Sequence, residues 1–194
     1  TPYPLEDARW DFAQPGAERR GIFIGTREWD VPSRHHLAAL QMALALGGPV
    51  TVSEPRPRRL RQLWSSLGGD WARLQLLPRR LPYRDYLAEM ARHRLVLQAD
   101  QSAVPGQVAG DALLCRLPCV GGDGAIDRLG FPSTSGFGRS LGELAELAAR
   151  LLRDDLFYAA TIAESQAAAK ERVSFSVVAR ALEAFFQRIT RRAS

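Results

Sequence analysis

The segment of residues 100–128 (DQSAVPGQVAGDALLCRLPCVGGDGAIDR) holds residue types in an order that could bind an anion. Its pattern predicts the end of a buried strand, a short helix that opens on Val104-Pro105-Gly106, then a second strand and a Gly-rich loop. Pro105 suits a first helical turn because its missing N–H needs no partner there, and Gly106 lets other atoms approach the backbone. The N–H groups of Gly106, Gln107 and Val108 would then point out of the helix start. This arrangement, with the helix dipole, binds a phosphate or diphosphate.

Polar groups on either side of this helix start could hold a sugar. Asp111 lies in an apolar helical stretch, where a carboxylate is costly to bury without a partner, so we expect it to bind a ribose or sugar hydroxyl, or an arginine. Ser102 is grouped with it as a sugar contact. The loop at 121–127 is either an ordinary turn or a sugar loop in which glycines permit close approach. In the second case the contacts are Gly122, Asp123 and Gly124.

Strands and helices alternate along most of the chain, which predicts an α/β fold: a Rossmann-like parallel sheet with helices on both faces and a helical C-terminal tail. Apolar runs predict strands at 21–26, 49–54, 74–78, 95–99 and 117–121. Helical periodicity and the stop signals predict helices at 33–46, 57–67 and 83–93. Ser140 followed by Glu143 is a capping box, which opens a helix to about residue 154.

The tail has two further helical stretches, roughly 155–171 and 176–191, with no strand between them. The chain therefore divides into a linker or arm at 1–20, a Rossmann-like domain at 21–154 that holds the predicted phosphate and sugar site, and C-terminal helices at 155–194 that pack on the same domain. Residues 1–20 are assigned to the arm because they are rich in Pro and charge.

An open parallel sheet binds its ligand at the carboxyl ends of its strands, where the strand order reverses. The ends of the first strand (Gly25) and the fourth (Asp100) are the expected switch point. Thr26, Arg27 and Arg34 follow the first strand, so they are candidates for a phosphate site. The alternative is that these arginines simply lie on a surface loop.

Composition limits the class of protein. The chain has 194 residues, 46% of them apolar, a net charge of +5 and a single lysine, Lys170. This excludes disorder, and no apolar run reaches the roughly 18 residues of a membrane span. The charge favours anionic ligands or acidic membrane surfaces, which allows peripheral membrane contact. The basic run Arg56, Arg58, Arg59 and Arg61 with Trp64 is interpreted as a solvated helix face, not as a nucleic-acid site.

The cysteines and histidines give no metal set and no catalytic triad. Cys115 and Cys119 are interpreted as small buried hydrophobes, and the absence of a disulfide framework favours a cytoplasmic protein. The pair His35-His36 is either catalytic or an ordinary surface pair. His93 should bond the terminal carbonyl groups of its helix.

The order of these pieces resembles the C-terminal, donor-binding domain of GT-B-fold glycosyltransferases, in particular the family 4-like (group 1) glycosyl transferases. The resemblance covers nearly the whole chain. It is carried by YPL near the start and by GIFIGTR, LPYRDYLAEMARHRLVLQAD, VPGQVAGDALLCRLPCVGG and Phe175-Ser176.

The resemblance implies transfer of a hexosyl group from a nucleotide-sugar in bacterial glycan biosynthesis, with retained configuration and without a metal or other cofactor. Catalysis would need an N-terminal acceptor domain that is missing here. It also implies that Arg27 and Arg34 face the donor diphosphate and that Asp111 matches the second of two acidic positions. The first falls on Ala103, which cannot accept a hydrogen bond.

Other functions remain open from the sequence. One is a non-catalytic Rossmann-like module that binds a protein partner or a regulatory nucleotide, with the basic helix at 56–61 as its contact surface. A dehydrogenase would need a Gly-x-Gly-x-x-Gly turn after the first strand, where the chain has GTREWD.

Overall fold

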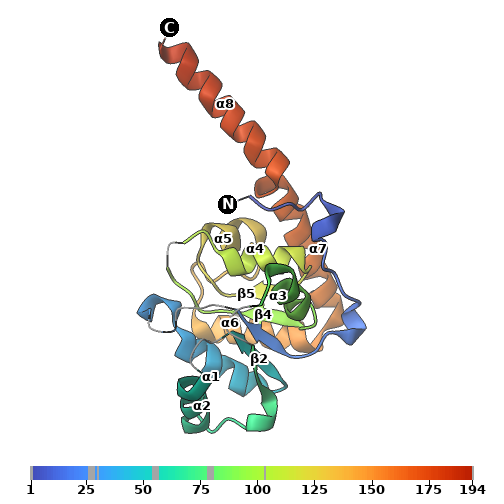
Figure 1. Cartoon of the computed structure of the whole chain (residues 1–194), viewed down its shortest axis with the longest axis vertical. Helices are drawn as coiled ribbons and strands as arrows, with labels where there is room; N and C mark the ends of the chain where they lie inside the picture. The colour runs from blue at the N-terminus through green and yellow to red at the C-terminus, as the bar shows by residue number, and fades with distance from the viewer. Residues whose placement is uncertain are drawn as a thin grey trace.

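The computed structural model of the chain describes residues 2–25, 29, 31–53, 57–77, 81–102 and 104–193. Within these ranges a parallel five-stranded sheet has the order β3-β2-β1-β4-β5 (Figure 1). This confirms the predicted Rossmann-like fold, with strands shorter than expected. The strands are β1 (Ile22–Ile24), β2 (Val50–Ser53), β3 (Leu74–Leu77), β4 (Leu95–Leu97) and β5 (Cys119–Val120).

The helices follow the predicted order, with one addition in the Gly-rich loop, α5. They are α1 (His36–Leu46), α2 (Pro57–Ser66), α3 (Tyr83–Met90), α4 (Gln107–Leu114), α5 (Ala125–Gly130), α6 (Leu141–Arg153), α7 (Asp155–Arg172) and α8 (Phe175–Ala193). α1 begins three residues later than predicted, because Pro32–Arg34 form a separate 3-10 turn and His35 has a positive φ of 46°. The capping box of α6 is confirmed: the Ser140 N–H donates to Glu143 Oε2 at 2.8 Å.

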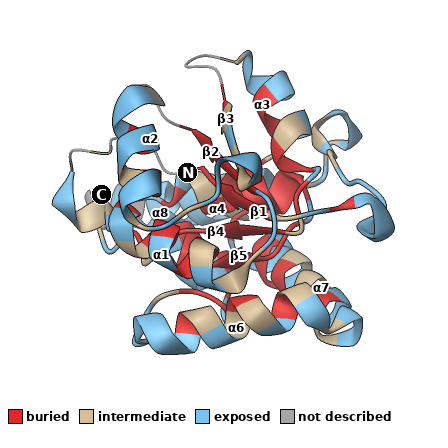
Figure 2. Ribbon diagram, turned by 90° about the horizontal axis from the view of Figure 1, so that it is seen from below, coloured by how far each residue is buried: buried red, intermediate tan, exposed pale blue. Residues whose placement is uncertain are grey.

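Alternate side chains of the strands enter two hydrophobic cores, one on each face of the sheet. Phe23 and Val96 belong to the core under α3, α4 and α7. Ile22 and Leu95, one residue before each, belong to the core under α1, α2 and α6. Because both faces are covered, the residues of β1, β2, β4 and β5 are buried, as Figure 2 shows for the centre of the molecule, whereas β3 at the edge is only partly buried. The prediction of helices on both faces is confirmed.

The N-terminal segment of the chain meets the junction between α7 and α8 beside α4. The Tyr3 N–H donates to the Val173 carbonyl at 2.8 Å, and the Phe175 N–H donates to the Tyr3 carbonyl at 3.1 Å. The Tyr3 ring is buried against Gly110, where a Cβ atom would lie only 1.9 Å from it. The described part of the expected arm at 1–20 is thus anchored to the domain at Tyr3.

The C-terminal helices differ from each other in their packing. α7 lies against α4, α5 and α6, whereas α8 extends away from the sheet (Figure 1). Of the region predicted to pack on the domain, α7 does so and most of α8 does not. Among the described residues, no helix is both long enough and apolar enough to cross a membrane.

Candidate functional site

A cavity of about 870 Å³ lies at the carboxyl ends of β1 and β4. These strands are neighbours in the sheet, and the chain leaves β1 toward β2 on one side and returns to β4 on the other. The strand order therefore reverses between Gly25 and Asp100, as predicted, and both residues line the cavity. Parallel sheets bind ligands at such a point because no strand covers it and the flanking loops diverge.

The start of α4 forms one wall of this cavity. Gly106 is the residue before the helix and has φ 82° and ψ 50°, a conformation that favours glycine. The first bond of the helix runs from the Gly110 N–H to the Gly106 carbonyl at 3.1 Å. The N–H groups of Gln107 and Val108 therefore have no partner within the helix and are available at its positive end. Pro105, Gly106, Gln107 and Val108, all predicted site residues, line the cavity.

Helix α5 holds this turn in place. The Ala125 N–H donates to the Val104 carbonyl at 3.2 Å, and the Ile126 N–H donates to the Pro105 carbonyl at 3.0 Å. This segment was predicted to be an ordinary turn or a sugar loop, and its contact with the turn before α4 was not predicted. The available signal was Gly124 followed three residues later by Asp127, because a carboxylate at this spacing commonly caps a helix.

Asp127 is the functional candidate that the sequence analysis missed. Its carboxyl group is almost fully buried yet contributes to the wall of the cavity. Oδ1 accepts a hydrogen bond from Gln98 Nε2 at 2.7 Å, and Oδ2 accepts one from the Gly124 N–H at 3.2 Å. Burial raises the pKa of Asp127 to about 7, and the charges of Asp100 and Asp123 add to the effect.

A second polar cluster lies at the end of β4. Arg34 forms an ion pair with Asp100, and its Nη1 donates to Ser102 Oγ at 2.9 Å. The Ser102 N–H donates to Asp100 Oδ1 at 2.8 Å. Arg34 lines the cavity, so the structure brings this predicted cation to the predicted switch point. Thr26, Arg27 and Ala103 lie outside the described residues.

Asp111 faces the cavity from α4 and has a tyrosine as its partner. It is buried and accepts a hydrogen bond from the Tyr83 hydroxyl at 2.5 Å. The Tyr3 hydroxyl donates to the Gln107 carbonyl at 3.0 Å nearby. Burial and then the Asp111 charge raise the pKa of Tyr3 and of Tyr83, so both hydroxyls stay protonated donors. The sequence predicts an arginine or a ribose hydroxyl as the partner of Asp111; among the described residues the Tyr83 hydroxyl is one partner.

Of the three residues predicted to form the sugar loop, Gly124 lines the cavity. Asp123 instead accepts a hydrogen bond from Arg128 Nε at 2.7 Å on the outer side. A Cβ atom on Gly122 would lie 2.3 Å from Asp127 Oδ1, so the protein itself makes a close approach at Gly122.

The remaining candidates have structural roles. His93 Nδ1 donates to the Glu89 carbonyl at 3.0 Å, as predicted for a histidine at a helix end, and its Nε2 lies 2.7 Å from Thr51 Oγ1. His36 is buried and stacks on Trp29 with 4.1 Å between ring centroids. Cys115 and Cys119 are buried free thiols, as predicted. No cluster of three metal-ligating His, Cys, Asp or Glu groups occurs in the described part of the chain.

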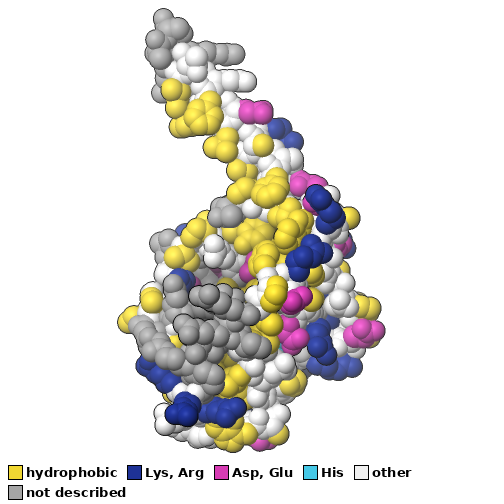
Figure 3. Space-filling view, in the orientation of Figure 1, with side chains coloured by type: hydrophobic (Ala, Val, Ile, Leu, Met, Phe, Trp, Pro, Cys, Tyr) yellow, Lys and Arg dark blue, Asp and Glu magenta, His cyan; other side chains and the backbone are white. Residues whose placement is uncertain are grey.

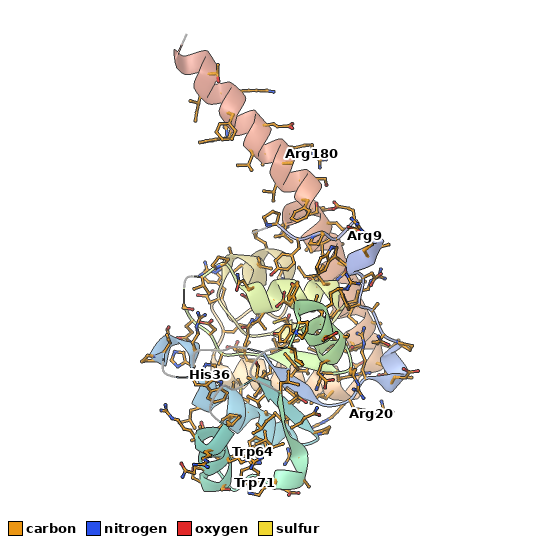
Figure 4. All side chains as sticks on the ribbon, viewed as in Figure 1. Arg9, Arg20, His36, Trp64, Trp71 and Arg180 are labelled. Atoms are coloured by element: carbon orange, nitrogen blue, oxygen red, sulfur yellow. The ribbon has the colours of Figure 1, made fainter. Side chains whose placement is uncertain are left out.

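The basic helix α2 does not present an aromatic surface. Trp64 is fully buried, and its Nε1 donates to the Asp70 carbonyl at 2.9 Å. Arg58 and Arg59 are exposed, which agrees with a solvated helix face. Figure 4 places Trp64 and Trp71 at the end of the molecule opposite α8 and its Arg180.

No protein-family profile matches the chain, and no curated protein sequence matches it. Solved structures do match. HepE of Anabaena, in complex with UDP and glucose, is 16% identical with a TM-score of 0.70 over 96% of this chain and 55% of its own. The lipopolysaccharide outer core galactosyltransferase WaaB is 10% identical, with a TM-score of 0.71 over 97% of this chain and 54% of its own.

A third match is WaaG, a glycosyltransferase involved in lipopolysaccharide biosynthesis. It is 15% identical, with a TM-score of 0.65 over 93% of this chain and 54% of its own. This chain thus spans about half the length of the three proteins. With the parallel sheet order and the cavity at its switch point, the match leads to one conclusion: the chain has the Rossmann-like fold of a GT-B glycosyltransferase domain.

Proposed function

We propose that the chain is the donor-binding part of a glycosyltransferase that moves a sugar from a nucleotide-sugar to an acceptor. The observation that carries this proposal is the start of α4, whose residues 106–108 line the cavity at the switch point. A helix start of this kind binds phosphate oxygens through N–H donors and the helix dipole. The similarity in fold to HepE, solved with UDP and glucose, supports a nucleotide-sugar as the ligand.

Stabilisation of the leaving diphosphate is the chemical task of this half of the enzyme. The N–H groups at 106–108 and the Arg34 guanidinium lie around one cavity and would offset the charge that develops on the leaving group. Arg34 can bind a phosphate bidentately if it turns from Asp100, with which it is paired. Arg27 is the second cation that we propose to face the diphosphate. We propose that these groups offset the charge of the diphosphate without a metal ion. We also propose that the anomeric configuration of the transferred sugar is retained.

Asp111 is the proposed ribose or sugar contact. A sugar hydroxyl would donate to the carboxylate, which the Tyr83 hydroxyl reaches at 2.5 Å from one side. A carboxylate can accept more than one hydrogen bond, so Tyr83 fixes its orientation without using its whole acceptor capacity. Gly124 lies on the same cavity wall as the Asp127 carboxyl and is the remaining candidate from the sugar loop.

Helix α8 supports an acceptor-binding domain as the partner. Its exposed apolar side chains follow helical spacing at Leu182, Phe185, Phe186 and Ile189. They form one side of the helix in Figure 3, and the exposed Phe175 at the helix start also lines the cavity. An apolar stripe that continues from a ligand site suits a second domain closing over that site. In a chain that carries such a domain, α8 should become protected from hydrogen exchange; unchanged exchange would contradict the assignment.

A nucleotide-binding experiment tests the proposed function. Thermal unfolding of the 194-residue chain would be followed with UDP, GDP, ADP and TDP, their sugar derivatives, and inorganic pyrophosphate. A ligand at 100 times its Kd stabilises by about 2.7 kcal/mol, which raises the Tm of a chain of this size by several degrees. We expect stabilisation by at least one nucleotide-sugar and by its nucleoside diphosphate.

The Asp111→Ala variant separates the sugar contact from the phosphate contact in the same experiment. It should weaken binding of the nucleotide-sugar and leave the smaller effect of pyrophosphate unchanged, because pyrophosphate has no ribose. If no nucleotide stabilises the wild-type chain, the non-catalytic module becomes the better interpretation. Its proposed contact surface is the exposed basic face of α2, with Arg58 and Arg59.

A further inference from the structure

We propose that Asp127 is a positioning residue that holds the phosphate-binding turn at Gly106, and that its carboxyl group takes up a proton when an anionic diphosphate binds there. The inference rests on the proposed function, because it takes the diphosphate site to be the start of α4. It adds a residue from another element, α5, and predicts how binding depends on pH.

The first support is the position of the carboxyl group between three backbone turns. A Cβ atom on Gly106 would lie 2.4 Å from Asp127 Oδ2, and one on Gly122 would lie 2.3 Å from Oδ1. The Gly124 N–H donates to Oδ2 at 3.2 Å. The carboxyl group therefore packs directly on the turns before α4, after β5 and before α5. Any shift of this group would move the turn at Gly106.

The second support comes from the backbone bonds of α5. Its N–H groups at Ala125 and Ile126 donate to the carbonyls of Val104 and Pro105, at 3.2 Å and 3.0 Å. Asp127, one residue later, adds its side chain to the same turn. The turn is thus held by three consecutive residues of α5, and its residues Pro105 and Gly106 line the cavity. This division of roles makes Asp127 a support for the turn and not a direct ligand of the donor.

The third support is the charge around Asp127. Its side-chain partners on β4 and before α5, Gln98 and Gly124, are neutral donors. Among the described residues, Arg34 is paired with Asp100 and Arg128 with Asp123. On the packed elements, burial raises the pKa of the Cys119 thiol and of the Tyr3 phenol, and both stay neutral.

These charges give the direction of the pH effect. Burial raises the pKa of Asp127 to about 7, with Asp100 and Asp123 adding to the effect. A bound diphosphate would add negative charge close to the carboxyl group and raise its pKa further. The complex then holds a proton that the free protein has lost above about pH 7. Affinity must therefore fall as the pH rises through this value, by at most about tenfold per pH unit for one proton.

Calorimetry with UDP-glucose tests the proposal, because its diphosphate is a diester and does not itself titrate in this range. Titrations between about pH 6 and pH 9, in buffers of different ionisation enthalpy, give both the affinity and the number of protons taken up. For the wild-type chain we expect uptake that approaches one proton above pH 7 and a matching loss of affinity. The Asp127→Asn variant should bind with little pH dependence. Asp123→Asn, on the exposed pair with Arg128, should keep the proton uptake but move it to lower pH, because the charge of Asp123 adds to the raised pKa of Asp127.

Each outcome distinguishes this proposal from the proposed function. If UDP-glucose binds and Asp127→Asn keeps the pH dependence, the role of Asp127 is wrong and the donor site stands. If UDP-glucose binds and the wild-type chain takes up no proton, the role of Asp127 is also wrong and the donor site stands. This measurement does not need the variant to fold. If neither UDP-glucose nor any other sugar nucleotide binds at any pH, the proposed donor site is wrong, and the proposed proton uptake by Asp127 is wrong as well.

Discussion

Gly106→Ala should weaken nucleotide-sugar binding by about 10- to 100-fold, because losing a hydrogen bond to a charged group costs roughly 1.5–3 kcal/mol. The backbone at Gly106 has φ 82°, and an added Cβ atom would lie 2.4 Å from Asp127 Oδ2. That oxygen belongs to a buried carboxyl group held by Gln98 and Gly124 and has no room to retreat. The turn must therefore move, and the N–H groups of Gln107 and Val108 move with it. Calorimetry with the best nucleotide-sugar measures the loss.

Gly138→Ala is the matched control for this variant. Gly138 also has a positive φ, 70°, but a Cβ atom there would meet nothing within 4 Å. Both variants should lose about 1 kcal/mol of stability from backbone strain, and only Gly106→Ala should lose binding. Equal affinities for the two variants would show that the turn at Gly106 is not the diphosphate site.

Arg19→Ala should lower the free energy of unfolding by about 3 kcal/mol or more and the Tm by roughly 10 °C. The Arg19 side chain is buried, with 3% of its surface exposed. Its Nη1 donates to the Arg116 carbonyl at 2.6 Å and to the Tyr158 hydroxyl at 2.9 Å, and its Nη2 donates to the Cys115 carbonyl at 2.9 Å. Truncation leaves these acceptors at the end of α4 without their donor and opens a cavity. Urea unfolding followed by circular dichroism gives the value.

Arg20→Ala is the control for the loss of one positive charge. Arg20 is exposed (Figure 4) and donates to the carbonyls of Ala17 and Arg19 next to it in the chain. Its removal should change stability by no more than about 0.5 kcal/mol. If the two variants lose similar stability, the contacts of Arg19 at the end of α4 do not stabilise the fold as we infer.

The main elements of the fold could be predicted from the sequence because their signals are local. Apolar runs separated by helical periods gave β1 to β5 in order, and the capping box at Ser140 and Glu143 marked the start of α6. The strand ends at Gly25 and Asp100 were predicted to be the switch point, and β1 and β4 are neighbours in the sheet. Handedness and connectivity rules leave few ways to arrange such a pattern.

The candidate site could be predicted only in part. The start of α4 was identified because Val104-Pro105-Gly106 is a local helix-start signal, although the helix itself begins at Gln107. The short α5 was missed, since six residues after a Gly-rich loop are too few to give a clear helical period. Asp127 was missed with it. Nothing in its sequence neighbourhood shows that its carboxyl group is buried beneath Gly106, twenty-one residues earlier.

The sequence by itself determined the parallel α/β sheet, the place where its strand order reverses, and the glycine turn that opens α4, because each depends on neighbouring residues. Only the tertiary structure decided the partners of the polar groups. It paired Asp111 with Tyr83, placed Asp127 under the turn and buried Arg19 among many exposed arginines. The reason is physical: the pairing and the pKa of a buried charge depend on which distant segments remove its water, and a linear pattern does not contain that information.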